Sequence, residues 1–128
     1  EIAVKIKFNP VKTEVKGKRV VLIDDSIVRG TTTKTLVRML REAGAKEVHL
    51  RIGSPPYKYP CYFGVDTSSR GQLLASKNDK ETICEWIGAD SLEYISYEGI
   101  IKAPVNSKVD FCTSCFTGVY PVDIPKEF

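Results

Sequence analysis

The chain has 128 residues, a formal net charge of +3 and 42% hydrophobic residues, which suits one domain with a modest core. The basic residues are dispersed, so a nucleic-acid partner is disfavoured. No apolar run approaches the roughly 20 residues that span a bilayer, and no secretory leader opens the sequence, so we expect a cytoplasmic protein with no membrane partner. Because Glu1 is not methionine and lies in a predicted strand, we also expect further sequence upstream.

The first two predicted strands flank a short turn. Apolar and polar residues alternate over residues 3–8, which predicts a strand that ends at Asn9 and Pro10. Residues 16–18 supply the turn. The continuous apolar run at residues 20–23 then predicts a second strand, which we expect to be buried on both faces as in a parallel sheet.

A helix and a third strand follow. Apolar residues at helical spacing predict a helix that runs to about Ala43, with Gly44 as its cap. Val48, Leu50 and Ile52 alternate with polar residues and predict a strand. A strand, a helix and a strand within about 35 residues form a βαβ unit. We therefore predict an α/β fold with a parallel sheet and a right-handed crossover.

Beyond this unit the pattern is less regular. Three prolines exclude regular structure from residues 53–60, which we expect to leave the C-terminal edge of the sheet as an extended connection. Asn78 precedes a predicted helix that Gly88 ends, and residues 92–97 predict one more short strand. We divide the chain into a domain portion, residues 1–101, and an irregular, partly mobile tail, residues 102–128.

Two acids end the apolar run and give the strongest functional signal. Ligands bind at the carboxyl ends of parallel strands, so Asp24 and Asp25 are expected at the mouth of a site. Residues 26–32 are small and rich in hydroxyl groups, and they lead into a helix whose free N–H groups suit a phosphate. A sugar phosphate would satisfy both parts, because carboxylates accept from ribose hydroxyls or hold a hydrated Mg²⁺. The alternative is that the acids only cap the turn.

Residues 20–32, Val-Val-Leu-Ile-Asp-Asp-Ser-Ile-Val-Arg-Gly-Thr-Thr, resemble the phosphoribosyl pyrophosphate (PRPP) signature of type I phosphoribosyltransferases. The part after the acids is similar to the amidophosphoribosyltransferase family, whereas salvage enzymes more often carry a Thr-Gly-Gly-Thr loop. Further segments extend the resemblance over nearly the whole chain, namely residues 8–11, 54–56, 59–61, 87–92 and 112–115. The resemblance implies that this chain is the C-terminal part of the phosphoribosyltransferase domain, containing its parallel βαβ portion.

The same resemblance implies roles for the motif residues. Asp24 and Asp25 would receive the ribose hydroxyls and Mg²⁺ of PRPP. The 5-phosphate would bind the loop, which consists of Ser26, Ile27, Val28, Arg29, Gly30 and Thr31. The Arg29 side chain could add positive charge to this loop or point to solvent, and the sequence leaves both open.

The chain has four cysteines, Cys61, Cys84, Cys112 and Cys115. In a cytosolic chain, the Cys-Thr-Ser-Cys spacing favours a metal or a cluster over a disulfide, with zinc as one candidate. Cys84 lies inside a helical pattern and is expected to be a buried core thiol. The family resemblance implies that Cys61, Cys112 and Cys115 join one upstream cysteine, outside this chain, to hold a [4Fe-4S] cluster. The ligand set would then be incomplete in this chain alone.

The resemblance implies an enzyme, a glutamine-dependent phosphoribosyltransferase that makes 5-phosphoribosylamine from PRPP and glutamine-derived ammonia in the first committed step of de novo purine synthesis. Purine nucleotide inhibitors and a homo-oligomeric assembly are implied as well. No catalytic residue of that reaction is expected in these residues, so we expect the chain alone to be inactive. The alternatives are a nucleobase phosphoribosyltransferase, a non-catalytic PRPP-binding regulator and a zinc-stabilised structural module.

Two further polar residues receive weaker interpretations. His49 lies on an alternating strand with no nucleophile beside it, which favours a surface or supporting role over catalysis. Arg70 lies in a segment that resembles the family, but the family commonly carries an acid near Gly71, so a nucleotide contact from Arg70 stays open.

Overall fold

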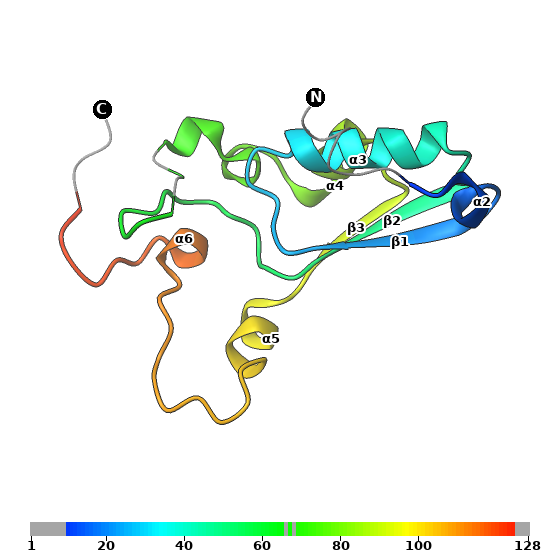
Figure 1. The fold of residues 1–128 in the computed structure, drawn as a ribbon. Coiled ribbons are helices and arrows are strands. Elements are labelled where there is room, and N and C mark those ends of the chain that lie inside the picture. The colour runs from blue at the N-terminus through cyan, green and yellow to red at the C-terminus, as the bar shows by residue number, and fades with distance from the viewer. Residues whose placement is uncertain (1–9, 66, 68, 125–128) are drawn as a thin grey trace.

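The computed structural model describes residues 10–65, 67 and 69–124, and a parallel sheet lies at their centre (Figure 1). The strands are β1 (Arg19–Asp24), β2 (Glu47–Ile52) and β3 (Ser91–Tyr94), in the order β1-β2-β3. Val20 pairs with Val48, and Leu50 pairs with Leu92, both in parallel register. The predicted α/β fold with a parallel sheet is therefore confirmed. The strand expected over residues 3–8 lies outside the described residues.

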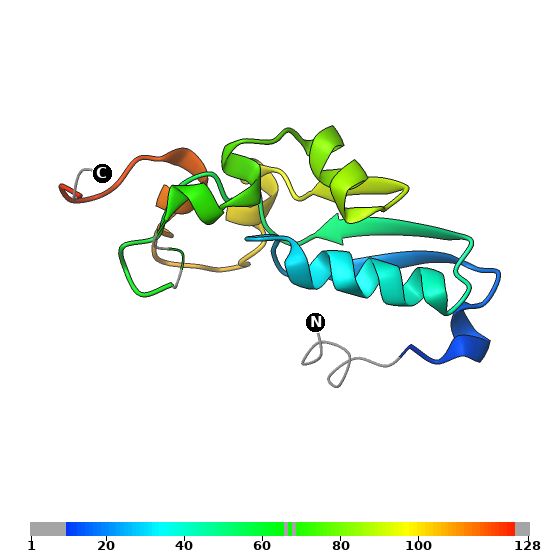
Figure 2. The ribbon, with the colours of Figure 1, turned by 90° about the horizontal axis from the view of Figure 1, so that it is seen from above.

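Helices α3 and α4 lie side by side on one face of the sheet (Figures 1 and 2). The helices are α2 (Lys12–Val15), α3 (Thr31–Glu42), α4 (Lys80–Ile87), α5 (Tyr97–Lys102) and α6 (Ser114–Thr117), with short 3-10 turns η1 (Arg70–Gln72) and η2 (Leu74–Ser76). Because α3 connects β1 to β2, it forms the predicted βαβ unit. Within the described ranges, no helix combines the length and the apolar character that crossing a membrane requires.

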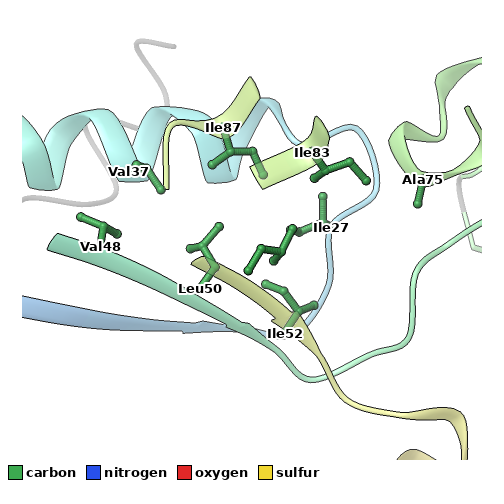
Figure 3. Packing of buried hydrophobic residues seen from close by; sticks show 9 residues of the cluster. Ile27, Val37, Val48, Leu50, Ile52, Ala75, Ile83 and Ile87 are labelled. Atoms are coloured by element: carbon green, nitrogen blue, oxygen red, sulfur yellow. The ribbon is translucent and has the colours of Figure 1, made fainter. Parts of the chain in front are cut away.

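The hydrophobic core fills the space between these two helices and the sheet (Figure 3). Its buried members are Ile27, Val37, Val48, Leu50, Ile52, Ala75, Ile83, Ile87 and Leu92. Burial of one aliphatic side chain stabilises a fold by about 1.5–3 kcal/mol. Since Ile27 belongs to the core and lies three residues beyond β1, the core also fixes the loop that follows the two acids.

The opposite face of β1 is open in the described part of the chain. Val21 is 58% exposed and Ile23 is 77% exposed. Leu22 packs against the core, and successive side chains of a strand point to opposite faces. β1 is also an edge strand of the described sheet. The prediction that residues 20–23 are buried on both faces is therefore wrong here, because α3 and α4 cover only one side.

Helix α4 begins one residue later than the sequence suggested. Asp79, and not Asn78, caps it, because the Asp79 carboxylate accepts a hydrogen bond from the N–H of Thr82 at 2.8 Å. The Asn78 side chain instead donates to the carbonyl oxygen of Leu74 at 2.8 Å. Gly88 ends α4 in the left-handed conformation, as expected.

The last predicted strand is shorter than residues 92–97. β3 ends at Tyr94, and Ser96 then caps α5, because its hydroxyl oxygen accepts from the N–H of Gly99 at 2.9 Å. After α5, the one-turn helix α6 is the remaining regular element of the described tail. Thus Tyr97, expected in the strand, lies in a helix.

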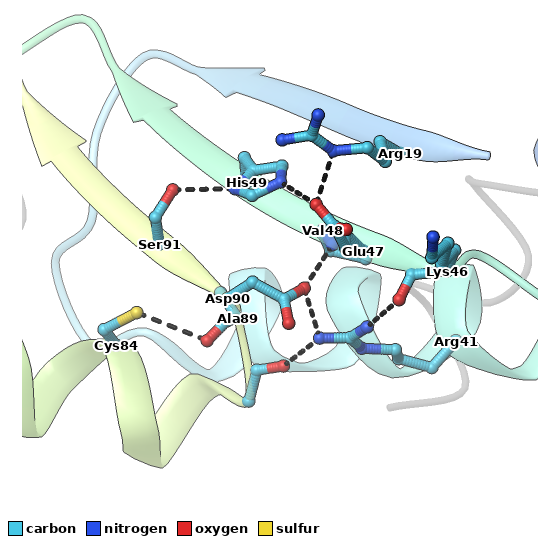
Figure 4. A network of polar contacts seen from close by, with 11 residues as sticks. Arg19, Arg41, Lys46, Glu47, Val48, His49, Cys84, Ala89, Asp90 and Ser91 are labelled. Carbon is cyan, nitrogen blue, oxygen red and sulfur yellow. Dashed lines mark hydrogen bonds and ion pairs between the residues drawn. The ribbon is translucent and has the colours of Figure 1, made fainter.

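A polar network joins the end of α3 to the sheet (Figure 4). The Arg41 guanidinium lies 2.6 Å from the Asp90 carboxylate and also donates to the carbonyl oxygens of Lys46 and Gly88. The same Asp90 oxygen accepts from the N–H of Val48 at 2.6 Å. The Val48 bond, with the Arg41 contact beside it, holds the pKa of Asp90 below its ordinary value. This network connects α3, α4 and β2 next to the start of β3.

Candidate functional site

The two acids lie at the C-terminal end of β1, where the strand ends and the loop begins. Asp24 is the last residue of β1 and is half-buried, whereas Asp25 is exposed. The N–H of Asp25 donates to the Asp24 carboxylate at 3.0 Å, and the N–H of Gly53 donates to the Asp24 carbonyl oxygen at 2.9 Å. Burial raises the pKa of Asp24, and the neighbouring Asp25 carboxyl adds to that rise. The pair can therefore offer oxygen ligands at the predicted edge of the sheet.

The acids and the loop share one hollow of about 300 Å³. It is lined by Asp24, Asp25, Ser26, Val28, Arg29, Gly30, Thr31, Thr32 and Thr33. No side chain of the described residues caps the N-terminus of the 12-residue helix α3, which opens into this hollow. Uncapped N–H groups and the helix dipole attract anions. A ligand with a phosphate at one end and hydroxyl groups at the other would match the hollow.

Ile27 differs from the other predicted loop residues. Its side chain is 1% exposed and packs in the core, so only its main chain is available to a ligand. The neighbouring Val28 lines the hollow, and its carbonyl oxygen accepts from the N–H of Leu74 at 2.9 Å. The 3-10 turn η2, which begins at Leu74, is therefore hydrogen-bonded to the loop. All the other predicted PRPP-binding residues line the hollow, and their binding role stays a prediction.

The Arg29 side chain has a partner that the sequence did not suggest. Its Nε and Nη2 atoms both donate to the Oε1 atom of Gln72, at 3.0 and 2.5 Å. Gln72 lies in η1, 43 positions further along the chain. Such a long-range pair leaves no local sequence signal. Arg29 thus lines the hollow with an exposed side chain that is hydrogen-bonded to Gln72.

Gly30 is required by space as well as by backbone conformation. Its φ is +74°, and a Cβ atom there would lie 2.6 Å from the Leu74 side chain and 2.9 Å from the Trp86 ring. Non-glycine residues rarely adopt this left-handed conformation. The loop therefore packs closely onto η2 and α4 at the point where α3 begins.

A larger hollow of about 590 Å³ lies between α3 and α4. The cationic side chains that line it already have partners within the protein. The Lys34 ammonium lies 4.1 Å from the centre of the Trp86 ring. Arg38 lies 3.7 Å from the Glu42 carboxylate, and Arg41 is paired in the network described above. Among the described residues, no acid lines this hollow. It therefore lacks the combination of carboxylates and anion donors found after β1.

Helix α6 docks on the connection that follows β2. The carbonyl oxygen of Cys115 accepts from the N–H groups of Lys58 and Tyr59 at 3.0 and 3.1 Å. The Tyr57 and Phe116 rings meet edge to face, with centroids 5.1 Å apart. The tail is thus attached to residues 57–59 through both main-chain and aromatic contacts.

This docking brings three of the four free cysteines into one region. Burial raises the pKa of Cys115, and the thiolates of Cys61 and Cys112 raise it further. By contrast, a hydrogen bond from the Ser114 hydroxyl lowers the pKa of Cys112. Among the described residues, no three His, Cys, Asp or Glu side chains are arranged to hold a metal ion. The three thiols therefore lie near one another without forming a closed ligand set, and the predicted cluster ligation stays a prediction.

The acid pair fits Mg²⁺ better than the thiols fit a cluster. Mg²⁺ usually keeps several waters and binds one or two carboxylates together with substrate phosphates. Asp24 and Asp25 need no third protein ligand for that purpose. An iron-sulfur cluster usually requires four protein ligands, one more than Cys61, Cys112 and Cys115 supply.

His49 and Arg70 have partners other than the two acids. The His49 ring contacts the Glu47 carboxylate and the Ser91 hydroxyl, each at 2.9 Å, near the middle of the sheet (Figure 4). The Arg70 guanidinium lies 5.0 Å from the centre of the Tyr59 ring. The arrangement of His49 is that of a supporting residue.

Cys84 lies apart from the other cysteines, in α4. Its thiol donates to the carbonyl oxygen of Ala89 at 3.3 Å and packs against the core. Burial raises the pKa of this thiol. Cys84 therefore has the surroundings of a structural thiol.

The chain is similar in sequence to known proteins. The phosphoribosyl transferase domain family matches residues 2–52. The chain is 50% identical to the amidophosphoribosyltransferase of Synechococcus elongatus, over 99% of this chain and 26% of that protein. It is also 50% identical to the amidophosphoribosyltransferase of Archaeoglobus fulgidus, over 99% of this chain and 28% of that protein.

The chain is also similar in fold to a solved structure. The structure of glutamine phosphoribosylpyrophosphate (PRPP) amidotransferase from B. subtilis, complexed with ADP and GMP, matches with a TM-score of 0.84 and 45% identity, over 99% of this chain and 30% of that one. The chain spans about a quarter of the length of the curated relatives it matches. In sequence and in fold, the chain is thus similar to one segment, about a quarter of the length, of the amidophosphoribosyltransferases.

Proposed function

We propose that this chain is the PRPP-binding part of an amidophosphoribosyltransferase, which makes 5-phosphoribosylamine from PRPP and glutamine in the first committed step of de novo purine synthesis. The observation that carries the proposal is the shared hollow, in which Asp24 and Asp25 meet the loop and the N-terminus of α3. One ligand with a ribose and a phosphate would use both. The similarity to amidophosphoribosyltransferases over nearly the whole chain supports the same proposal.

In this proposal the loop binds the 5-phosphate. Ser26, Thr31 and Thr32 line the hollow, and their hydroxyl groups can donate to phosphate oxygens. Main-chain N–H groups at the start of α3 add further donors, and each hydrogen bond to a charged group contributes about 1.5–3 kcal/mol. Ile27 would take part only through its main chain, because its side chain is buried.

Asp24 and Asp25 would bind the ribose hydroxyls and a hydrated Mg²⁺. When bound, Mg²⁺ supplies positive charge that stabilises the leaving diphosphate. The exposed Asp25 is open to water and ligand, whereas Asp24 is held by its contacts to the N–H groups of Asp25 and Gly53. Both carboxylates would thus orient the sugar ring while the loop holds its phosphate.

The described residues would position the substrate and leave the chemistry to other parts of a longer protein. Fixing the ribose 5-phosphate lets ammonia approach the anomeric carbon in one geometry as diphosphate leaves. The curated relatives are about four times as long as this chain. We therefore expect no glutamine-dependent diphosphate release from the purified 128-residue chain, and detectable release would refute this expectation.

In the longer protein, Cys61, Cys112 and Cys115 would join a fourth cysteine from outside this chain to hold a [4Fe-4S] cluster. The grouping of these thiols where α6 docks supports the proposal. The cluster would be structural and would fix the tail against residues 57–59. Iron and sulfide in the purified longer protein are expected, whereas zinc alone would favour a structural zinc site. Purine nucleotide inhibitors, a homo-oligomeric assembly and a cytoplasmic location also belong to this proposal.

The test is a calorimetric titration of the 128-residue chain with PRPP in the presence of Mg²⁺. The double variant Asp24→Asn/Asp25→Asn keeps the size of both side chains but removes their charge. We expect it to lose at least about tenfold in affinity, because charged hydrogen bonds are worth more than neutral ones. Asp110→Asn, on the exposed tail, is the matched control and should bind like the unaltered chain. Equal affinity of the double variant and the control would refute the assignment.

A further inference from the structure

Arg29, at the rim of the hollow, is held by a neutral group. Two of its nitrogen atoms, Nε and Nη2, donate to the single amide oxygen Oε1 of Gln72. Both side chains are exposed, and no carboxylate among the described residues forms an ion pair with Arg29. Within the described residues, the guanidinium is therefore held by a neutral hydrogen-bond acceptor and not by an ion pair.

The contact is not needed to attach η2, the turn that follows η1, to the loop. The N–H of Leu74 already donates to the carbonyl oxygen of Val28 at 2.9 Å, and Gly30 packs closely on Leu74 and Trp86. These contacts join the two segments through main chain and apolar packing. The contact between Gln72 and Arg29 acts instead on the orientation of one exposed, flexible side chain.

The geometry also leaves donors free. A guanidinium carries five N–H groups, and Gln72 accepts one from Nε and one from Nη2. In the part of the chain that the structure describes, the two N–H groups of Nη1 and the second N–H group of Nη2 have no acceptor. Since Arg29 lines the same hollow as the loop, an anion in that hollow is the acceptor that its position and charge suit.

We propose that Gln72 is a positioning residue for phosphate binding: its amide oxygen orients the Arg29 guanidinium at the rim, and its neutrality leaves the full arginine charge for the 5-phosphate. This inference rests on the proposed function of the hollow. A glutamate at position 72 could make the same hydrogen bonds but would compensate the charge. A leucine would leave the charge and remove the orientation.

The inference predicts an order of affinities that a purely structural role would not produce. With ribose 5-phosphate and Mg²⁺ as the probe, the unaltered chain should bind most tightly, Gln72→Leu less tightly and Gln72→Glu least tightly. We expect the loss in Gln72→Glu to be roughly threefold to tenfold, since an exposed charge acts through screened solvent. Raising the salt concentration should reduce the difference in ribose 5-phosphate affinity between Gln72→Glu and the unaltered chain, because salt screens the added charge. If Gln72 only supported the loop, Gln72→Glu would bind as well as the unaltered chain, and Gln72→Leu would be the weakest.

The control is Asn106→Asp, which makes the same change from amide to carboxylate on the exposed loop after α5. It should bind ribose 5-phosphate like the unaltered chain, and urea unfolding should show Gln72→Glu to be at least as stable as the unaltered chain. Wild-type affinity in Gln72→Glu would overturn this inference alone if the double Asp24→Asn/Asp25→Asn variant still loses binding. Failure of the unaltered chain to bind ribose 5-phosphate would overturn the proposed function and this inference together.

Discussion

Replacement of Gly30 by alanine tests how closely the loop packs on the rest of the fold. The residue has a φ of +74°, and an added Cβ atom would lie 2.6 Å from Leu74 and 2.9 Å from Trp86. The left-handed conformation costs an alanine about 1–2 kcal/mol. The Leu74 side chain can rotate away, but the Trp86 ring is broad and lies under Lys34, so overpacking adds about 1–3 kcal/mol.

Gly17→Ala is the matched control, because Gly17 has the same φ of +74° and nothing lies within 4 Å of its added Cβ atom. Its free energy of unfolding should therefore fall only by the cost of the left-handed backbone conformation, about 1–2 kcal/mol. Urea unfolding of the 128-residue chain can be followed by the fluorescence of Trp86, its single tryptophan. In the folded state, this fluorescence should differ from that of the unaltered chain in Gly30→Ala but not in Gly17→Ala. Equal free energies of unfolding for the two variants would refute the close packing of the loop.

Three further predictions concern charge and thiol chemistry. Asp90→Ala should lower the free energy of unfolding by about 1–3 kcal/mol, because the Val48 N–H loses its acceptor. Because the pKa of Asp90 is lowered in the folded protein, its carboxylate contributes stability that is fully present above pH 3.8, the ordinary pKa of the group. This contribution is lost as the pH falls through the lowered pKa, and acid unfolding of Asp90→Ala should lack this loss of stability. Cys112 should be alkylated by iodoacetamide before the other cysteines, as mass spectrometry can show, and Ser114→Ala should slow it, because the hydroxyl lowers the thiol pKa. Asp24→Asn should unfold in urea at neutral pH no earlier than the unaltered chain, because burial raises the pKa of Asp24 and so disfavours its charged form; a clear loss of stability would contradict this.

The sheet and the acid pair could be predicted because their signals are local. Alternation at Val48, Leu50 and Ile52 follows directly from a strand with one face on the core, and these residues are at most 3% exposed. The position of Asp24 and Asp25 follows from the direction of a parallel strand. Such features depend on residues close in sequence, which a periodic pattern records.

The errors arose where distant parts of the chain decide the outcome. The apolar run of β1 did not reveal that Val21 and Ile23 lie on a face left open by the described residues. Asn78 and Asp79 are both good helix caps, and the contact between Asn78 and Leu74 decided between them. The partner of Arg29 lies 43 residues away. No periodicity connects these pairs, so three-dimensional packing was needed to find them.

The most direct test of the central claim is to locate ribose 5-phosphate on the chain by NMR. In a ¹⁵N-labelled sample with Mg²⁺, ribose 5-phosphate should shift the main-chain amide signals of residues 26–31 together with those of Asp24 and Asp25. Inorganic phosphate should shift the loop signals, and ribose alone should leave them unchanged, because the loop recognises the phosphate. Shifts confined to the larger hollow between α3 and α4, or no shifts at all, would contradict the account.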